Sequence, residues 1–406
     1  MRKRAKPSQI GRFHFDPLLI VLSTSLLLIG YVMVASSSLH LGVKMTGNCL
    51  YYPFRQSIHI GLGLFLGACV ALTPIRAWEK LGQWLFIGGL LLLVIVLVPG
   101  LGIKVNGSTR WLSLGGLRIQ VSEVVKYFAV IYMAGYVTRH QQSIRESAFG
   151  LIKPLILFSV ASLLLLMEPD FGSAVVILII AMGIMFLAGA RLSQFIMLLS
   201  FVALLAVLLV YFEPYRMKRV TSFMNPWADP KDTGYQLVHA LISFGRGEWS
   251  GVGLGSGIQK LFYLPEAHTD FLFSVIGEEL GLLGVLTVIV LFSLLIWRTF
   301  EIGVAAEKAG ERFSAFIAYG LGIWFGFQAF VNMGGIWFGF QAFVNMGVNM
   351  GILPTKGLTL PLMSYGGGSM MIMCCAVALL FRVHTEVAEI NASSPRGSVG
   401  MRIRNG

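Results

Sequence analysis

Long apolar runs, separated by short polar or Gly/Pro-rich breaks, dominate the chain. A run of about 17 to 25 apolar residues is long enough to cross a bilayer as one helix. Ten such runs are found, at 17–38, 57–74, 83–101, 121–137, 152–167, 172–189, 192–212, 271–297, 313–347 and 368–384. The pattern therefore predicts an all-α polytopic membrane protein, with about ten transmembrane helices and both termini on one side.

One polar connection is much longer than the others and covers residues 213–270. Its many aromatic residues argue against disorder, so we expect one large ordered outer-face loop. The predicted organisation is a cytoplasmic basic tail at 1–16, transmembrane helices 1–7 at 17–212, a large periplasmic loop at 213–270, transmembrane helices 8–10 at 271–384 with a re-entrant outer segment at 353–369, and a cytoplasmic tail at 385–406.

The ninth apolar run contains an internal repeat. Residues 322–334 read GIWFGFQAFVNMG, and residues 335–347 repeat these letters. Thirteen helical residues turn the chain by about 220° net and lengthen it by about 20 Å, so the two copies present different faces at different depths. We interpret the repeat as a tandem duplication or an artefact of the sequence, with a functional insertion as the alternative.

The composition excludes a water-soluble globule, because 56% of the residues are hydrophobic and only 12% are charged. Three of the four cysteines, Cys69, Cys374 and Cys375, fall in apolar runs, so no disulfide framework or zinc site is predicted. Walker-loop, H-E-x-x-H and Cys-x-x-Cys motifs do not occur in the sequence. The alternating glycines of 251–257 are interpreted as a flexible turn.

Positive charge indicates the orientation of the predicted helices. Most of the 31 lysines and arginines, including those of the amino-terminal tail, lie on the side of the two termini, which is therefore predicted to be cytoplasmic. The remaining cations gather in 103–126 and 213–260 on the predicted outer face. An anionic partner is expected to meet the protein there, and no nucleic acid is expected.

The first candidate cluster lies at the outer end of the fourth run. Glu123 and Lys126 are three residues apart and share a helix face, while Arg118 and Arg110 precede them. Ionisable groups at a membrane boundary are costly and therefore suggest function. The cluster either anchors the helix at the interface or holds a phosphate group.

The second candidate cluster directly precedes the eighth run and contains Glu266, His268 and Asp270. An aspartate at the start of a helix is an ordinary N-cap, whereas three titratable side chains within five residues also suit a catalytic site. The residues alone leave both interpretations of Asp270 open.

The third candidate segment carries Lys356 and Ser364 and joins the ninth and tenth runs. Its prolines and its glycine run indicate an irregular outer segment, which membrane proteins tolerate where it lines a cavity. Both side chains are assigned to substrate binding.

Four further carboxylates are predicted near the outer boundary. Glu278 and Glu279 lie deeper in the eighth run and are interpreted as polar packing or as partners of cations such as Lys126, with a proton relay as the alternative. Glu168 and Asp170 stand at a predicted outer turn, where they either cap the sixth helix or face the same cavity.

Several strings of the chain resemble the SEDS family (shape, elongation, division and sporulation), in its division branch more than its elongation branch. These strings are RIQVSEVVK at 118–126, EPYRMKRVTSFMNPWADP at 213–230, GYQLVHALISFGRG at 234–247, YLPEAHTDFLFSVIGEELG at 263–281 and LPTKGLTLPLMSYGGGS at 353–369. Val121 departs from the usual proline of the family, and the thirteen-residue duplication has no counterpart in the family pattern.

The resemblance implies a peptidoglycan glycosyltransferase of the bacterial inner membrane that polymerises lipid II at the division septum with a class B penicillin-binding protein and other division proteins. By motif, it assigns Asp270 as the essential carboxylate and Arg118 and Lys126 as essential cations, with Glu123 beside them. No cofactor is certain, and assistance by a divalent cation (Mg²⁺ or Mn²⁺) is left open.

The chemistry suits these residue types. Joining lipid II to the nascent glycan strand needs one base for the acceptor 4-hydroxyl, and the diphosphate leaving group of the donor needs cations more than an acid. A lipid II flippase is the competing hypothesis, but its polar groups should line the whole membrane depth, whereas here they gather at the outer end. A non-catalytic division scaffold leaves the outer cations unexplained.

Overall fold

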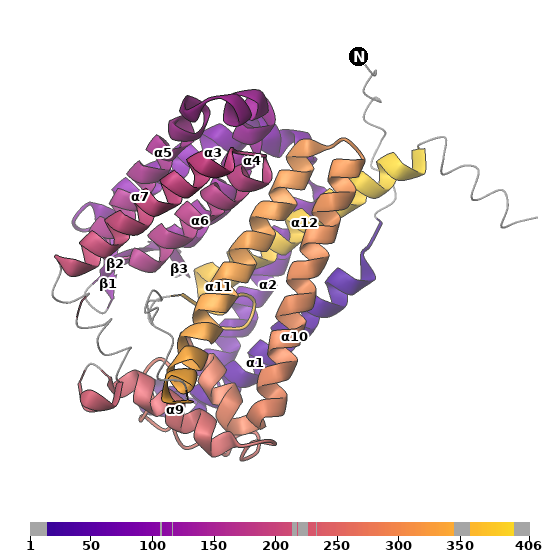
Figure 1. Ribbon diagram of the computed structural model, residues 1–406. Coiled ribbons are helices and arrows are strands. Elements are labelled where there is room, and N and C mark those ends of the chain that lie inside the picture. The colour runs from indigo at the N-terminus through magenta and orange to yellow at the C-terminus, as the bar shows by residue number, and fades with distance from the viewer. Residues whose placement is uncertain are drawn as a thin grey trace, which may run out of the picture.

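The computed structural model describes residues 14–105, 108–115, 117–212, 217, 226–232, 234–344 and 358–393 (Figure 1). Its helices are α1 (Pro17–Thr46), α2 (Tyr51–Leu72), α3 (Ile75–Leu97), α4 (Val121–Glu146), α5 (Ala148–Met167), α6 (Phe171–Leu187), α7 (Leu192–Tyr211), α9 (Tyr235–Gly247), α10 (Leu272–Lys308), α11 (Arg312–Val344) and α12 (Gly367–Ser393). A short 3₁₀ helix, η1, covers Pro226–Ala228.

Each of the ten predicted apolar runs falls on one of the helices α1–α7 and α10–α12. Within the described residues, seven helices are long and apolar enough to cross a membrane. α4 is not among these seven, and it carries Glu123 and Lys126 on a face packed inside the bundle. The all-α membrane fold predicted from the sequence is confirmed.

A small antiparallel sheet, which the apolar pattern did not predict, fills the connection between α3 and α4. Its strands are β1 (Gly102–Val105), β2 (Ser108–Leu114) and β3 (Leu117–Gln120), paired in the order β1-β2-β3. Ser113 of β2 lies opposite Arg118 of β3. The sheet lies at the same end of the bundle as α9 (Figure 1), and we call this end the sheet end.

The long connection after α7 is ordered where the structure describes it, as predicted. α9 packs on the first part of α10, and the turns at 251–271 lead from α9 into that helix. α10 is broken at Gly281, whose φ of 64° suits glycine. The amides of Leu282 and Leu283 donate instead to the carbonyls of Glu248 and Trp249, so the connecting loop replaces the lost helical hydrogen bonds.

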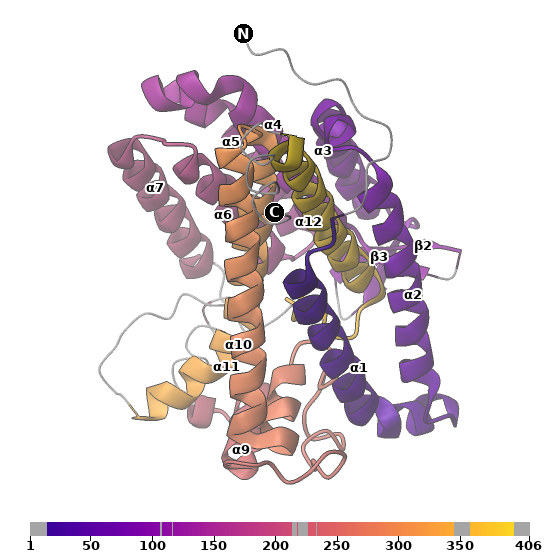
Figure 2. The same ribbon diagram turned by 90° about the vertical axis from the view of Figure 1, so that its right-hand side faces the viewer.

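The beginning of α1 and the end of α12 meet at the other end of the molecule, which we call the tail end. The hydroxyl of Thr385 donates to the carbonyl of His14, and Arg298 of α10 donates to Asp16 at 2.7 Å. In Figure 2, α12 runs between α10 and α2. The described chain therefore starts and finishes on one side, as an even number of crossings requires.

Candidate active site

A buried ion pair on α4 forms the centre of the candidate site. Lys126 Nζ donates to Glu123 Oε1 at 2.8 Å, one turn earlier on the same helix. Both residues are at most 1% exposed. Lys126 Nζ also donates to Gln328 Oε1 at 3.0 Å and lies 5.6 Å from the ring centroid of Trp324. The pair that was predicted from its spacing is formed, with additional partners from α11.

The amide side chains of α11 connect this pair to two other segments. Gln328 Nε2 donates to the carbonyl of Thr359 at 2.9 Å. Asn332, one turn further, donates from Nδ2 to the carbonyl of Leu358 at 2.8 Å and to that of Asp270 at 3.1 Å. The ion pair of α4, the segment after α11 and the Asp270 loop are therefore held together by one helix.

Asp270 is half-buried at the start of α10. The helix begins at Leu272, its N-cap residue is Phe271, and no side chain caps it by a hydrogen bond. Asp270 therefore does not occupy the N-cap position that the capping interpretation required. Its backbone is fixed by the amide of Asn332, close to the polar stretch of α11.

His268 packs in an aromatic cluster beside this loop. Its ring centroid lies 5.3 Å from that of Tyr52 and 5.4 Å from that of Tyr365. The amide of Tyr365 donates to the carbonyl of His268 at 3.0 Å. Burial lowers the pKa of His268, while the nearby Glu266 carboxylate raises it. Because burial has the larger effect, the pKa of His268 lies below its ordinary value.

Glu266 is exposed and accepts a hydrogen bond from the hydroxyl of Thr269 at 2.7 Å. Ser364 is buried, and its hydroxyl accepts from the amide of Leu360 at 2.9 Å, which closes a turn of its own segment. These contacts give Ser364 a structural role in the described fold. Lys356 lies outside the described residues.

Arg118 is exposed on the last strand of the sheet. β3 packs against the beginning of α12 so closely that a Cβ on Gly368 would lie 2.7 Å from the amide nitrogen of Gln120. Arg118 is also near enough to Tyr365 to act electrostatically on its phenol. The strand therefore brings one exposed cation to the aromatic cluster.

Arg110 lies elsewhere at the sheet end and donates to the backbone carbonyls of Glu168 and Pro169, between α5 and α6. Asp170 caps α6 by accepting from the amide of Ser173, which was one of the two predicted roles. Burial, and secondly the charge of Asp170, raises the pKa of Glu168 to about 8, so this carboxyl group is protonated at pH 7. Arg110 thus supports the turn before α6.

Glu278 and Glu279 form a separate buried network. Glu279 accepts from Lys260 at 2.5 Å and from Ser36 at 2.7 Å, and Glu278 accepts from the amide of Ile258 at 2.9 Å. The predicted role in polar packing is confirmed, but the cations are Lys260, on Glu279, and Arg246, 3.6 Å from Glu278, rather than Lys126. The glycines of 251–257 form a tight turn beside these carboxylates. Three of them have positive φ angles, and a Cβ on the fourth, Gly257, would lie 3.0 Å from a carboxylate oxygen of Glu278 and of Glu279.

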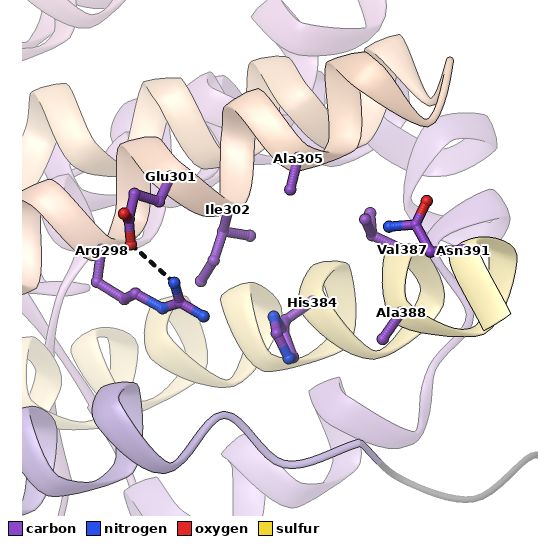
Figure 3. Close-up of a pocket in the computed structure, with 8 residues that line it drawn as sticks. All are labelled: Arg298, Glu301, Ile302, Ala305, His384, Val387, Ala388 and Asn391. Atoms are coloured by element: carbon purple, nitrogen blue, oxygen red, sulfur yellow. Dashed lines mark hydrogen bonds and ion pairs between the residues drawn. The ribbon is translucent and has the colours of Figure 1, made fainter. Parts of the chain in front are cut away.

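A pocket of about 140 Å³ lies at the tail end, between α10 and α12 (Figure 3). Its lining residues are Arg298, Glu301, Ile302, Ala305, His384, Val387, Ala388 and Asn391. Arg298 is paired with Glu301 at 2.7 Å and with Asp16, so its charge is compensated within the protein. This pocket is far along the helices from the candidate site.

Four residues beside the site were not predicted from the sequence: Gln328, Asn332, Tyr52 and Tyr365. One signal was available, because Gln328 and Asn332 are polar residues one helical turn apart in an otherwise apolar run. Among the described residues, no three His, Cys, Asp or Glu side chains gather as metal ligands.

The fold and the site define a multi-pass membrane protein with a cluster of ionisable side chains at one end of its helices. The family model for FtsW, RodA and SpoVE cell cycle proteins matches residues 17–337 and 334–389. The chain therefore belongs to this family, which confirms the resemblance to SEDS proteins. The two matched ranges overlap at residues 334–337, where the first copy of the repeat ends and the second begins.

Two relatives match almost the whole chain. The probable peptidoglycan glycosyltransferase FtsW of Methylomonas methanica is 64% identical over 97% of this chain and 98% of its own length. The protein of the same name from Methylococcus capsulatus is 56% identical over 93% of this chain and 91% of its own length.

Two solved structures share the fold. A chain from a study of the structural coordination of polymerization and crosslinking by a peptidoglycan synthase complex aligns with a TM-score of 0.73 and 28% identity, covering 92% of this chain and 98% of that chain. The rod shape determining protein RodA of Thermus thermophilus aligns with a TM-score of 0.64 and 26% identity, covering 92% and 97%.

Proposed function

We propose that the chain is a peptidoglycan glycosyltransferase that polymerises lipid II into β-1,4 glycan strands at the division septum. The observation that carries this proposal is the convergence of the Lys126 pair and the Asp270 loop on two adjacent turns of α11. The names of the relatives support the reaction class.

In the proposed mechanism, Asp270 removes the proton from the 4-hydroxyl of the acceptor sugar. A properly placed general base typically contributes about 10²–10⁴-fold to a rate. Arg118 and Lys126 hold the diphosphate of the donor, whose negative charge increases as the glycosidic bond forms. One carboxylate and two cations suffice, because a diphosphate leaves without protonation. Attack from the opposite face converts the α-linked donor to a β-linked product.

Lys126 has hydrogen-bonding capacity left for this role. An ammonium group has three N–H donors, and the described contacts use two of them, toward Glu123 and Gln328. Arg118 is exposed and brings a second cation from a different element. Mg²⁺ or Mn²⁺ bound to the diphosphate oxygens would share this neutralisation, and polymerisation with and without a chelator measures that contribution.

The partner and location are proposed on the same basis. A solved structural neighbour comes from a peptidoglycan synthase complex that combines polymerization with crosslinking. We infer that this chain works beside a crosslinking enzyme, a class B penicillin-binding protein, and other division proteins in the inner membrane, with both tails in the cytoplasm. The basic residues of the tail end agree with that orientation.

The purified protein, mixed with its transpeptidase partner and lipid II, tests the proposed function directly. Glycan strands resolved on a gel are the expected product. Translocation of lipid II across vesicles, without polymer under any partner or metal condition, would replace this proposal with the flippase hypothesis.

A further inference from the structure

Three polar side chains on α11 form a buried row, which we call the α11 row. Trp324, Gln328 and Asn332 are spaced four residues apart, so they lie on one face of the helix. Trp324 and Gln328 are fully buried, and Asn332 is 8% exposed. Buried polar groups are costly in a membrane unless they serve a partner, and each member of this row has one.

The contacts of Gln328 determine the orientation of its amide. Its Oε1 accepts from Lys126 Nζ at 3.0 Å and from Trp324 Nε1 at 2.8 Å. Its Nε2 donates to the carbonyl of Thr359 at 2.9 Å. A flipped amide would place its NH₂ group against two donors and its oxygen against a carbonyl. Only the observed orientation satisfies all three neighbours, and it directs the oxygen at the ammonium.

Two acceptors on two different helices therefore define the direction of the Lys126 ammonium. Glu123, on α4 itself, accepts one N–H of Lys126 at 2.8 Å, and Gln328, on α11, accepts another. With two N–H groups held, the direction of the third is fixed as well, because the ammonium is tetrahedral. Without Gln328, the ammonium would be free to rotate about its single remaining contact.

We propose that Gln328 is a positioning residue that aims the free N–H of Lys126 at the diphosphate of the donor. Asn332, one turn further, holds the backbone of Asp270 in the same helical frame. The α11 row thus sets the diphosphate-binding cation and the base at a fixed separation. This inference rests on the proposed function and adds a residue to it.

The repeat in the sequence supplies a matched control. Gln341 is the same residue in the same string, GFQAF, thirteen residues later. Thirteen helical residues correspond to about 20 Å and a different face, so one helix cannot place both glutamines beside Lys126. Gln328 occupies that place in the structure.

The experiment compares Gln328→Met with Gln341→Met in the full-length protein with its partner, and measures KM and kcat for lipid II. A hydrogen bond to a charged group is typically worth about tenfold in binding or more. We expect KM to rise about tenfold in Gln328→Met. A merely structural defect would lower the active fraction, and hence kcat, while KM stayed the same. Gln341→Met should leave KM and kcat unchanged.

A KM within twofold of the original in Gln328→Met, or an equal rise in Gln341→Met, would overturn the inference. If Gln328→Met fails to insert into the membrane, the same KM limits are applied to Gln328→Asn. Its shorter amide cannot reach both Lys126 and Thr359. Lys126→Met separates this inference from the proposed function. An active Lys126→Met defeats the role proposed for the cation, whereas an inactive Lys126→Met with a normal Gln328→Met defeats only the role of Gln328.

Discussion

Lys126 is a charged residue whose burial costs free energy. Its ammonium is fully buried, and its partner Glu123 is equally removed from water. Removing two charges from water costs several kcal/mol per ion, and the attraction between them recovers this only with good geometry and further hydrogen bonds. The contacts with Gln328 and Trp324 supply that support. A buried pair of this kind adds little stability, which favours a functional reason for it.

Lys126→Met should abolish polymerisation. It should also lower the free energy of unfolding by about 3–5 kcal/mol, because Glu123 would remain as an uncompensated buried charge. The double variant Lys126→Met/Glu123→Gln removes that charge and is expected to regain stability without activity. Thermal unfolding in detergent and the lipid II gel assay measure the two effects. Activity near normal in either variant would reduce the pair to a helix anchor.

At the scale of residues, contacts within one helix could be predicted from the sequence, and contacts between distant helices could not. The spacing of Glu123 and Lys126 was sufficient to predict their ion pair, since three residues on a helix bring side chains together. The partner of Lys126 on α11 is 202 residues away in the chain, and no local pattern encodes that distance. For the same reason, Glu279 was not matched with Lys260.

Among the elements, α10 shows how a broken helix inside a membrane protein can keep its backbone groups hydrogen-bonded. At Gly281 the helical hydrogen bonds are interrupted, and the loop after α9 supplies replacements to the amides of Leu282 and Leu283. In return, the carbonyls of Glu278 and Glu279 accept from Val252 and Gly253. The break therefore fixes the loop after α9 against the helix that follows Asp270.

Gly281→Ala tests this arrangement, and Gly310→Ala serves as its control. Its φ is 64°, and an added Cβ would lie 2.3 Å from the amide nitrogen of Gly251. Gly310 also has a positive φ, of 84°, but an added Cβ meets nothing within 4 Å. Gly310→Ala is expected to cost only about 1–2 kcal/mol, from the backbone conformation alone. Gly281→Ala should lower the thermal unfolding midpoint clearly more, and equal midpoints would contradict the account.

The duplicated segment of α11 leads to a second prediction at this scale. Arg312–Gly334 already gives 23 residues of membrane-spanning length, and the first copy alone carries the described contacts to Lys126 and Asp270. Deleting Gly335–Gly347 is therefore expected to leave expression, thermal stability and polymerisation at least equal to those of the full chain. Loss of any of these would show that the second copy is structural.

The elements themselves were largely predictable, because a membrane helix needs one long apolar run and nothing else. The sheet between α3 and α4 was missed because its strands are of four, seven and four residues, too short for a reliable alternation. The break at Gly281 was missed because the apolar run continues across it.

For the whole molecule, the tail end holds both described ends of the chain, and the sheet end holds the site. This separation agrees with the proposed orientation, in which substrate is met outside. The distribution of charge predicts which side each cluster faces, and this orientation stays a prediction. The sequence could not predict that Lys126 and the Asp270 loop both contact α11, because packing between distant helices decides that.

Cys49 provides a test of this orientation. It is an exposed free cysteine in the connection between α1 and α2. Cys69 is exposed within the apolar helix α2, and Cys374 and Cys375 are buried. A membrane-impermeant thiol reagent added to intact spheroplasts is expected to label the protein, and Cys49→Ala should remove the label. Labelling that appears only after the membrane is opened would reverse the orientation.

The central claim is that Asp270 is the base of a lipid II polymerase. The measurement that tests it most directly is polymerisation by Asp270→Asn, with its partner present and its thermal stability recorded. Asparagine keeps the size of the side chain and the backbone contact with Asn332 but cannot accept the proton. We predict a loss of about 10²–10⁴-fold with an unchanged unfolding midpoint. Normal polymerisation of lipid II by this variant would contradict the account.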